Sequence, residues 1–282
     1  MVCISIVDVV IDKIIIEQSP DDKTKDRNIA LTQLGAILGA IYPNIIFYIL
    51  FTDLYSMTTW RLFFMIGIFS LSPVLFMGFL VNVKNNMPVN EEIITEDAVD
   101  FSSIILLCVI LFLFHGERIY EYPLEPWVLN KFGEQYFSLL VLLLIVLIII
   151  NALGVILGSI ISNKLNRKLL LMISSAIYGM LLIIVPFTNF IWFFVFFAIM
   201  QIFSGIIVVN LGTLMIKYSK NKVTYFQFMA LFGIMALVIF IPLGTYLSSI
   251  IATEIIIIIA GVFKLISIIP IYFLIIKNEK TD

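Results

Sequence analysis

The chain is poor in the side chains from which catalytic and metal sites are usually built. It has one histidine, His115, and two cysteines, Cys3 and Cys108, which both lie in apolar segments. Isolated cysteines of this kind favour small buried side chains over a disulfide or a metal site. H-E-x-x-H, G-x-S-x-G and phosphate-loop motifs are absent from the sequence. We therefore expect no enzyme, no metal site and no cofactor.

Charge is also scarce. Charged residues make up 13% of the chain and the net charge is −2, whereas a typical soluble domain has about 25% charged residues. No basic stripe is present, which argues against binding of nucleic acid. The first residues, MVCISIVDVVIDK, lack a basic region and contain Asp8 and Asp12, so a cleaved signal peptide is not expected.

What the chain has in abundance is apolar sequence. Hydrophobic residues make up 62% of it and the mean hydropathy is +1.13, which indicates that lipid is the solvent for most of the chain. A membrane-crossing helix needs about 20 apolar residues, and such runs favour helices over barrel strands. We predict an all-α, polytopic membrane helix bundle with a shorter helix over residues 1–17 and eight spans, at 29–51, 60–82, 101–121, 136–161, 168–187, 190–216, 223–248 and 253–276.

The basic residues predict the orientation of these spans. Of the 17 lysines and arginines, 13 fall on one side of the predicted membrane, 3 fall on the other, and Lys264 lies within the last span. The richer side is expected to be cytoplasmic, which places a multi-pass protein in the cell membrane with its carboxyl terminus inside. The longest loop on that side, 83–100, is acidic and polar. It predicts a linker between a three-helix domain, 1–82, and a six-helix bundle, 101–282.

Two short segments carry a family resemblance. Residues 14–39 and 214–236 match weakly as a repeat six helices apart, as in one large transporter fold. The turn GSIISNKLNRK (158–168) resembles the major facilitator superfamily signature G-G-x-x-A-D-R-x-G-R-R. Asn tolerates the left-handed conformation that the family's glycine supplies, but losing the acid argues against a charge relay through this loop. Gly158, Lys164, Arg167 and Lys168 keep the pattern, while Asn163 and Asn166 replace its Asp and Gly.

A second resemblance concerns the amino terminus. Asp8, Asp12, Glu17 and Pro20 look like the fourth helix of facilitators related to muropeptide permeases, acetyl-CoA transporters and folate–biopterin transporters. The resemblance implies that the chain corresponds to helices four to twelve of a twelve-helix transporter. It also implies secondary transport of a small-molecule substrate by alternating access, with proton coupling as a candidate.

Two other functions stay open. The alternative is a transport-incompetent remnant that acts as a membrane interaction or regulatory protein, with self-association or a partner replacing the missing helices. An intramembrane enzyme built on His115 and Glu117 ranks third, because the two residues face apart on a helix.

Two groups of ionisable residues are candidates for a substrate or proton pathway. Asp8 and Asp12 share a helix face and lie deep in the membrane if Glu17 marks its surface, so they suit a proton or cation site. A structural acid, or a first helix that is not inserted, would explain them equally. His115 and Arg118 share another face, where a histidine can exchange protons and an arginine can hold an anion. The alternative there is an interfacial cluster, because Tyr120, Tyr122, Pro123 and Pro126 follow and the prolines are expected to end the helix.

Polar residues in other spans more often bond between helices than bind ligand. The pathway candidates of this kind are Asn151 in span 136–161 and Gln201 in span 190–216, which also contains Ser204 and Asn210. Lys264 is expected to pair with an acid or to reach the surface.

Glycine spacing predicts helix contacts. The pairs Gly35/Gly39 and Gly154/Gly158 are G-x-x-x-G motifs, which allow close approach of helix backbones. Because the pairs have similar predicted depths, we expect span 29–51 to cross span 136–161 at these glycines. The small face of span 223–248 is expected to be left to lipid or to another copy: Gly233, Ala236 and Gly244.

Overall fold

The computed structural model of the chain describes residues 21–50, 101–133, 137–162, 164–219 and 222–274. All regular structure in this part of the chain is helical, as predicted. The predicted helices at 1–17 and 60–82 lie outside the described residues, and so do Cys3, Asp8 and Asp12.

The helices follow the apolar runs of the sequence. Six stretches are long and apolar enough to cross a membrane, which indicates a multi-pass membrane protein: Phe101–Phe132, Leu142–Ile161, Arg167–Phe187, Phe190–Ser219, Val223–Leu247 and Thr253–Phe273. They correspond to the last six predicted spans. The elements are α2 (Asp22–Leu50), α4 (Phe101–Gly116), η1 (Glu117–Tyr120), α5 (Glu121–Phe132), α6 (Phe137–Ile161), α7 (Arg167–Ile184), η3 (Val185–Phe187), α8 (Phe190–Ser219), α9 (Val223–Leu247), α10 (Thr253–Ile266) and α11 (Ile268–Phe273).

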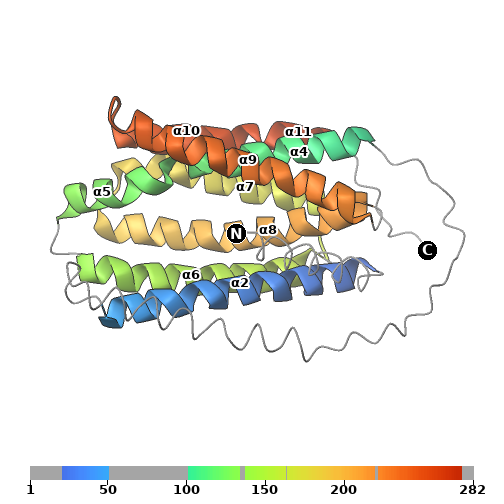
Figure 1. Ribbon diagram of the computed structural model, residues 1–282, viewed down its shortest axis with the longest axis horizontal. Helices are drawn as coiled ribbons and strands as arrows, with labels where there is room; N and C mark the ends of the chain where they lie inside the picture. Colours follow the sequence, from blue (N-terminus) through green and yellow to red (C-terminus); the bar gives the residue numbers. More distant parts are fainter. Residues whose placement is uncertain (1–20, 51–100, 134–136, 163, 220–221, 275–282) are drawn as a thin grey trace, which may run out of the picture. The chain divides into compact units, whose positions relative to one another are not determined.

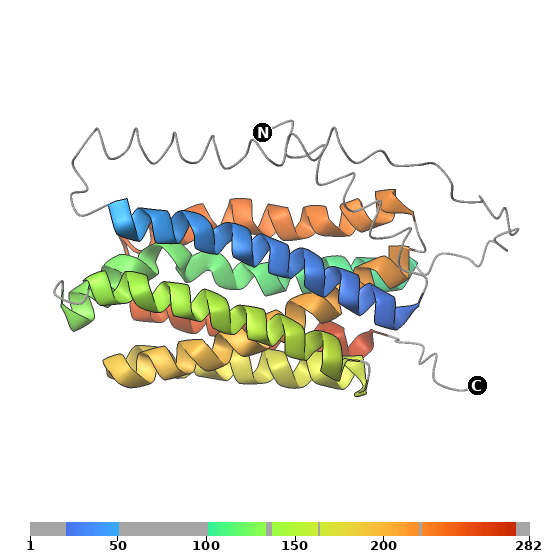
Figure 2. The same cartoon turned by 90° about the horizontal axis from the view of Figure 1, so that it is seen from below.

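The chain divides into two compact units, one formed by residues 1–37 with 99–282 and the other by residues 38–98. The larger unit thus takes in the first part of α2, and its second segment begins next to the predicted linker end at 100. Helices α4 to α11 of this unit run roughly along one axis in Figure 1, and Figure 2 shows the same alignment from a second side. We call the two ends of the bundle the Asp26 end, where α2 and α7 begin, and the Trp127 end, where α5 lies.

Helix α6 packs closely against α8 at glycine residues of both helices. A Cβ atom on Gly154 would strike the carbonyl oxygen of Ile202, and one on Gly158 would lie 2.9 Å from Cα of Ile206. A Cβ on Gly205 of α8 would in turn lie 2.5 Å from the backbone nitrogen of Val155. The backbones of α6 and α8 are therefore in direct contact, and a side chain at any of these three glycines would push them apart.

The predicted crossing of span 29–51 with 136–161 at paired glycines is therefore wrong. Gly35 and Gly39 of α2 have no atom within 4 Å of the position of a Cβ. Helix α2 instead places Ile29 against Gly212 of α8, at 2.9 Å from the position of a Cβ. Gly205 and Gly212 lie seven residues apart and so share a helix face. That face of α8 contacts α6 at one glycine and α2 at the other.

The small-residue face of α9 is buried, contrary to the sequence-based expectation. Gly233 lies against the His115 ring, and Gly244 lies against the backbone carbonyl of Ile119. Ala236 is fully buried. These small residues let α9 approach α4 and η1 closely. The outward face of α9 carries large apolar side chains, among them Leu231, Ile234 and Val238.

The segment after His115 changes helical type but does not end at its prolines. Helix α4 stops at Gly116, the four residues of η1 form a 3₁₀ turn, and α5 then continues to Phe132. Pro123 lies in the first turn of α5, where a missing N–H costs little. The helix ends at Gly133, whose φ of 106° suits glycine alone among common residues.

Candidate functional site

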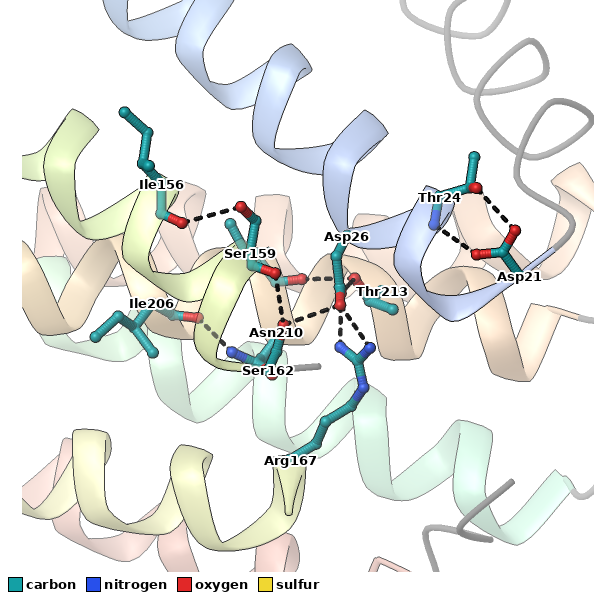
Figure 3. A network of polar contacts seen from close by, with 11 residues as sticks. Asp21, Thr24, Asp26, Ile156, Ser159, Ser162, Arg167, Ile206, Asn210 and Thr213 are labelled. Carbon is teal, nitrogen blue, oxygen red and sulfur yellow. Dashed lines mark hydrogen bonds and ion pairs between the residues drawn. The ribbon is translucent and has the colours of Figure 1, made fainter. Parts of the chain in front are cut away.

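A buried ionic network lies at the Asp26 end (Figure 3). The side chain of Asp26 in α2 is fully buried. Arg167, the first residue of α7, donates from both terminal nitrogens to the two carboxylate oxygens, at 2.6 and 2.7 Å. Ser162, just after α6, donates to Asp26 at 2.9 Å, and Thr213 of α8 donates at 2.7 Å. One carboxylate of α2 thus binds groups from three other helical regions.

The chemistry of this network is that of a helix clamp. A bidentate arginine–carboxylate pair is among the strongest polar contacts in proteins, and the two hydroxyls satisfy the remaining acceptor sites of the carboxylate. Breaking it exposes or strands a buried charge. Breaking such a buried pair from one side typically costs about 3–5 kcal/mol.

Asp26 was not among the residues predicted from the sequence. It lies within the charged run DDKTKDR, whose composition alone favours a solvated turn. The available signal is its spacing: Ile29 and Ala30, three and four residues later, are buried on the same face. An acid on the buried face of a helix needs a partner from elsewhere in the fold.

The signature-like turn supplies that partner. Arg167, at the end of the turn 158–168, pairs with Asp26 of α2, since this turn contains no acidic residue of its own. Asn166 is not left-handed as expected: with φ −63° and ψ 115° it caps α7, accepting hydrogen bonds from the backbone nitrogens of Lys168 and Leu169. Lys164 is exposed, and the ammonium of Lys168 lies 5.0 Å from the Tyr272 ring centroid. Asn163 lies outside the described residues.

Asp21, in the same charged run, has a different role. It is exposed and accepts hydrogen bonds from the backbone N–H and the hydroxyl of Thr24, both at 2.8 Å. The backbone hydrogen bond from Thr24 is the main cause that lowers the pKa of the Asp21 carboxyl below its ordinary value. Asp21 thus caps the start of α2.

A second ion pair lies near the middle of the helices. The ammonium of Lys264 in α10 lies 2.7 Å from Oε2 of Glu117 in η1, with side-chain exposures of 0% and 5%. The contact has the distance of an ion pair without the alignment of a hydrogen bond. Glu117 follows Phe101 by 16 residues and precedes Phe132 by 15, and Lys264 is similarly central in Thr253–Phe273. The open question about Lys264 is thereby answered: it pairs with an acid.

Aromatic rings complete the surroundings of Lys264. Its ammonium lies 3.0 Å from the centroid of Phe114 and 4.5 Å from that of Tyr178, and such contacts stabilise a desolvated cation by about 2 kcal/mol or more. The hydroxyls of Tyr178 and Tyr120 lie 3.5 Å apart. Lys264 is therefore stabilised by both a carboxylate and two rings.

The pair belongs to a polar level between two apolar clusters. One cluster includes Phe114, Leu171 and Met229, and the other includes Ile119 and Ala236. Between these levels along α4, η1, α7 and α10 lie the five residues that we call the polar layer: His115, Glu117, Ser174, Ser175 and Lys264.

The residues around His115 differ in exposure. Glu117 is 4% exposed, whereas the side chain of Arg118 is 46% exposed and bonds to Glu121 at 3.0 Å, as expected from their spacing. His115 is half-buried and packs on Gly233, and its Nδ1 atom is buried. Because α5 extends to Phe132, this group lies near the middle of the helical stretch Phe101–Phe132.

The remaining pathway candidates contact each other. The side-chain nitrogen of Asn151 in α6 donates to both the carbonyl and the side-chain oxygen of Gln201 in α8, each at 3.1 Å. This is the interhelical bond that the sequence favoured. At the Trp127 end, Trp127 donates to Glu254 at 2.7 Å and Lys131 donates to the carbonyl of Pro186, which ties α5 to α10 and η3.

In the described part of the chain, no three His, Cys, Asp or Glu side chains gather in a way that would hold a metal ion. The free thiol of Cys108 is buried, as expected. A comparison with known protein families finds no match for the chain, and a comparison with curated proteins finds no relative.

Proposed function

We propose that the protein is a secondary transporter that moves a small polar solute across a membrane by alternating access. One observation carries the proposal: Arg118 and Glu121 are almost half exposed near the middle of the 32-residue helical stretch Phe101–Phe132, directly after its apolar run ends at Gly116. An arginine facing lipid at the centre of a helix costs at least about 2.5–3.5 kcal/mol. The exposed pair is stable at this depth if it lines a water-filled cavity.

The exposed face suits a polar solute that carries charge. Tyr122 and Glu125 are exposed beside Arg118 and Glu121, so the face offers both signs of charge and an aromatic ring. When Glu121 releases it, the guanidinium of Arg118 has the fork geometry that binds a carboxylate or phosphate through two hydrogen bonds.

The Asp26 network supports the second requirement, a device that opens and closes. Alternating access needs helices that part at one end and are held there in the other state. Asp26 joins α2 to α7, α8 and the turn after α6. Because one buried carboxylate holds all three regions, loss of its contacts would release α2 from them together, which suits a latch at that end.

Labelling of cysteines with a charged, membrane-impermeant thiol reagent tests the proposed cavity. The protein is placed in lipid vesicles with Cys3 and Cys108 replaced by alanine. Tyr122→Cys probes the exposed face of α5, and Val238→Cys on α9 is the matched control, because the two native side chains are 66% and 68% exposed. We expect rapid labelling at position 122 and little at 238, since only the first faces water.

The opposite outcomes separate the candidate functions. Equal protection of both cysteines would place Arg118 against lipid or against another protein, and transport through this face would be refuted. That result would favour the alternative, a membrane interaction protein that covers its exposed charged face with a partner.

A further inference from the structure

The polar layer contains buried atoms without a protein partner. Ser174 and Ser175 of α7 are 0% and 1% exposed, and neither hydroxyl has a hydrogen-bond partner in the described structure. The buried Nδ1 of His115 is in the same condition. All three atoms belong to the polar layer between the two apolar clusters, and a common explanation is needed for them.

Other hydroxyl groups in these helices behave differently. Ser219 and Ser267 each donate to a backbone carbonyl three residues earlier in the chain, at 2.7 and 2.6 Å. This is the ordinary way in which a helix satisfies a serine or threonine. Ser174 and Ser175 do not use it, so their hydroxyls are available to another acceptor or donor.

Water is the ligand that fits these groups. A buried polar atom left without a partner costs about 1–3 kcal/mol, and a buried water makes about three hydrogen bonds to such atoms. We propose that the polar layer is a buried water site which brings protons to the Glu117–Lys264 pair.

Glu117 is the member of the pair that takes up the proton. A proton that arrives through the water site binds a carboxylate oxygen of Glu117 and breaks the ion pair. Lys264 keeps its three ammonium protons, because Phe114 and Tyr178 continue to stabilise the cation. The charge of the pair rises from zero to +1, and release of the proton to the same water site restores it.

The other ionisable groups around the pair do not replace Glu117 in this role. Tyr178 faces it from α7, and Tyr120, Arg118 and His115 lie beside it on η1 and α4. On α5, Glu121 is bound to Arg118 at the exposed surface. Helix α9 brings Gly233 and Phe240 to this level, which do not ionise.

The water site itself is independent of the proposed transport; only the use of the proton as a coupling ion rests on it. A proton held in the middle of the bundle would couple the state of α4 and η1 to that of α10. The experiments below measure water and protonation without any solute, so that their failure is distinct from a failure of transport.

Radical labelling tests the water site in the unmodified protein. Millisecond X-ray exposure of the full chain in lipid nanodiscs creates hydroxyl radicals from bound water, which oxidise side chains within a few ångströms. Leu171 and Leu182 form a matched pair, because both are fully buried on α7 but Leu171 lies three residues from Ser174 and Leu182 lies eight. We expect at least fivefold more oxidation at Leu171 than at Leu182. Equal, low oxidation of both leucines would overturn the proposal.

Infrared titration tests the proton. Lowering the pH protonates other carboxylates as well, so the test is a difference between variants. We expect the protonated carboxylic-acid band to contain one component that is missing in Glu117→Gln and present in Glu121→Gln. A band with every component retained in a folded Glu117→Gln variant would overturn the assignment. If that variant does not fold, Ser174→Ala with Ser175→Ala provides the second test: deuterium exchange of the band should slow at least tenfold, and an unchanged exchange rate would refute the relay.

Discussion

Removal of the Asp26 carboxylate should destabilise the protein far more than removal of a neighbouring carboxylate in the same run. In Asp26→Asn the side chain keeps its size but loses its charge, so that Arg167 loses a bidentate contact of 2.6 and 2.7 Å. Both side chains are at least nine-tenths buried. Breaking a buried ion pair from one side typically costs about 3–5 kcal/mol, and we expect a loss in this range.

The assay is equilibrium unfolding in mixed detergent–sodium dodecyl sulfate micelles, followed by circular dichroism. Asp21→Asn is the matched control, because Asp21 is an exposed cap five residues earlier and asparagine caps helices equally well. We expect this variant to unfold like the wild type.

The double variant Asp26→Asn with Arg167→Gln separates charge from packing. With both charges removed, an amide pair can keep part of the hydrogen bonding, and at least half of the lost free energy should return. The reasoning would be refuted if Asp26→Asn and Asp21→Asn unfolded alike. It would also be refuted if the loss of unfolding free energy in the double variant equalled the sum of the losses in the two single variants.

Three further outcomes are expected. Gly154→Ala should lower the unfolding free energy by about 1–3 kcal/mol, because the added Cβ strikes the carbonyl of Ile202. Gly35→Ala, with open space around the added Cβ, should raise the unfolding free energy by up to about 1 kcal/mol. The same unfolding assay measures both variants, and equal effects would contradict the α6–α8 contact. Lys264→Met should cost about 3–5 kcal/mol by leaving Glu117 without its counter-ion, and adding Glu117→Gln should recover at least half, which thermal unfolding in detergent can measure. The lowered pKa of Asp21 means that its capping contribution is present above the ordinary value of 3.8 and is lost as the pH falls through the folded-state pKa; hydrogen exchange of residues 21–30, corrected for intrinsic rates, should therefore quicken below about pH 4 in the wild type but not in Asp21→Asn, and identical pH profiles would refute the cap.

The helices of the larger unit were predictable because lipid imposes a simple rule on sequence. Runs of about 20 apolar residues can satisfy their backbone only as helices, and each of the last six runs forms one. The ends were harder to predict. Pro123 was expected to stop the helix, but a proline in a first turn is compatible with helix, and α5 continues to Phe132.

Helix partners were not predictable from the same rules. The pair Gly154/Gly158 indicates that another backbone comes close, without saying which one. Gly205 of α8 is the glycine that meets this pair, and the sequence also contained it. Pattern gives the face of a helix, whereas the choice between several small faces depends on how the whole chain packs.

The charged residues show the same limit. Arg118 and Glu121 form an ion pair that their i, i+3 spacing on one helix favours. Glu117 and Lys264 are 147 residues apart, so no spacing within one helix relates them. Only the fold brings them together. Asp26 lay between these cases, because its place on the buried face of α2 was visible but its partner Arg167 was not.

Solute uptake into lipid vesicles tests transport most directly. Vesicles that contain the protein, and protein-free vesicles, are incubated with a mixture of small polar metabolites under an imposed proton gradient, and their contents are analysed by mass spectrometry. Arg118→Ala, on the exposed face, is the variant for comparison. We predict that at least one charged solute accumulates only with the wild-type protein and that Arg118→Ala abolishes this uptake. Vesicles with folded protein that accumulate nothing beyond the protein-free control would contradict the proposed transport.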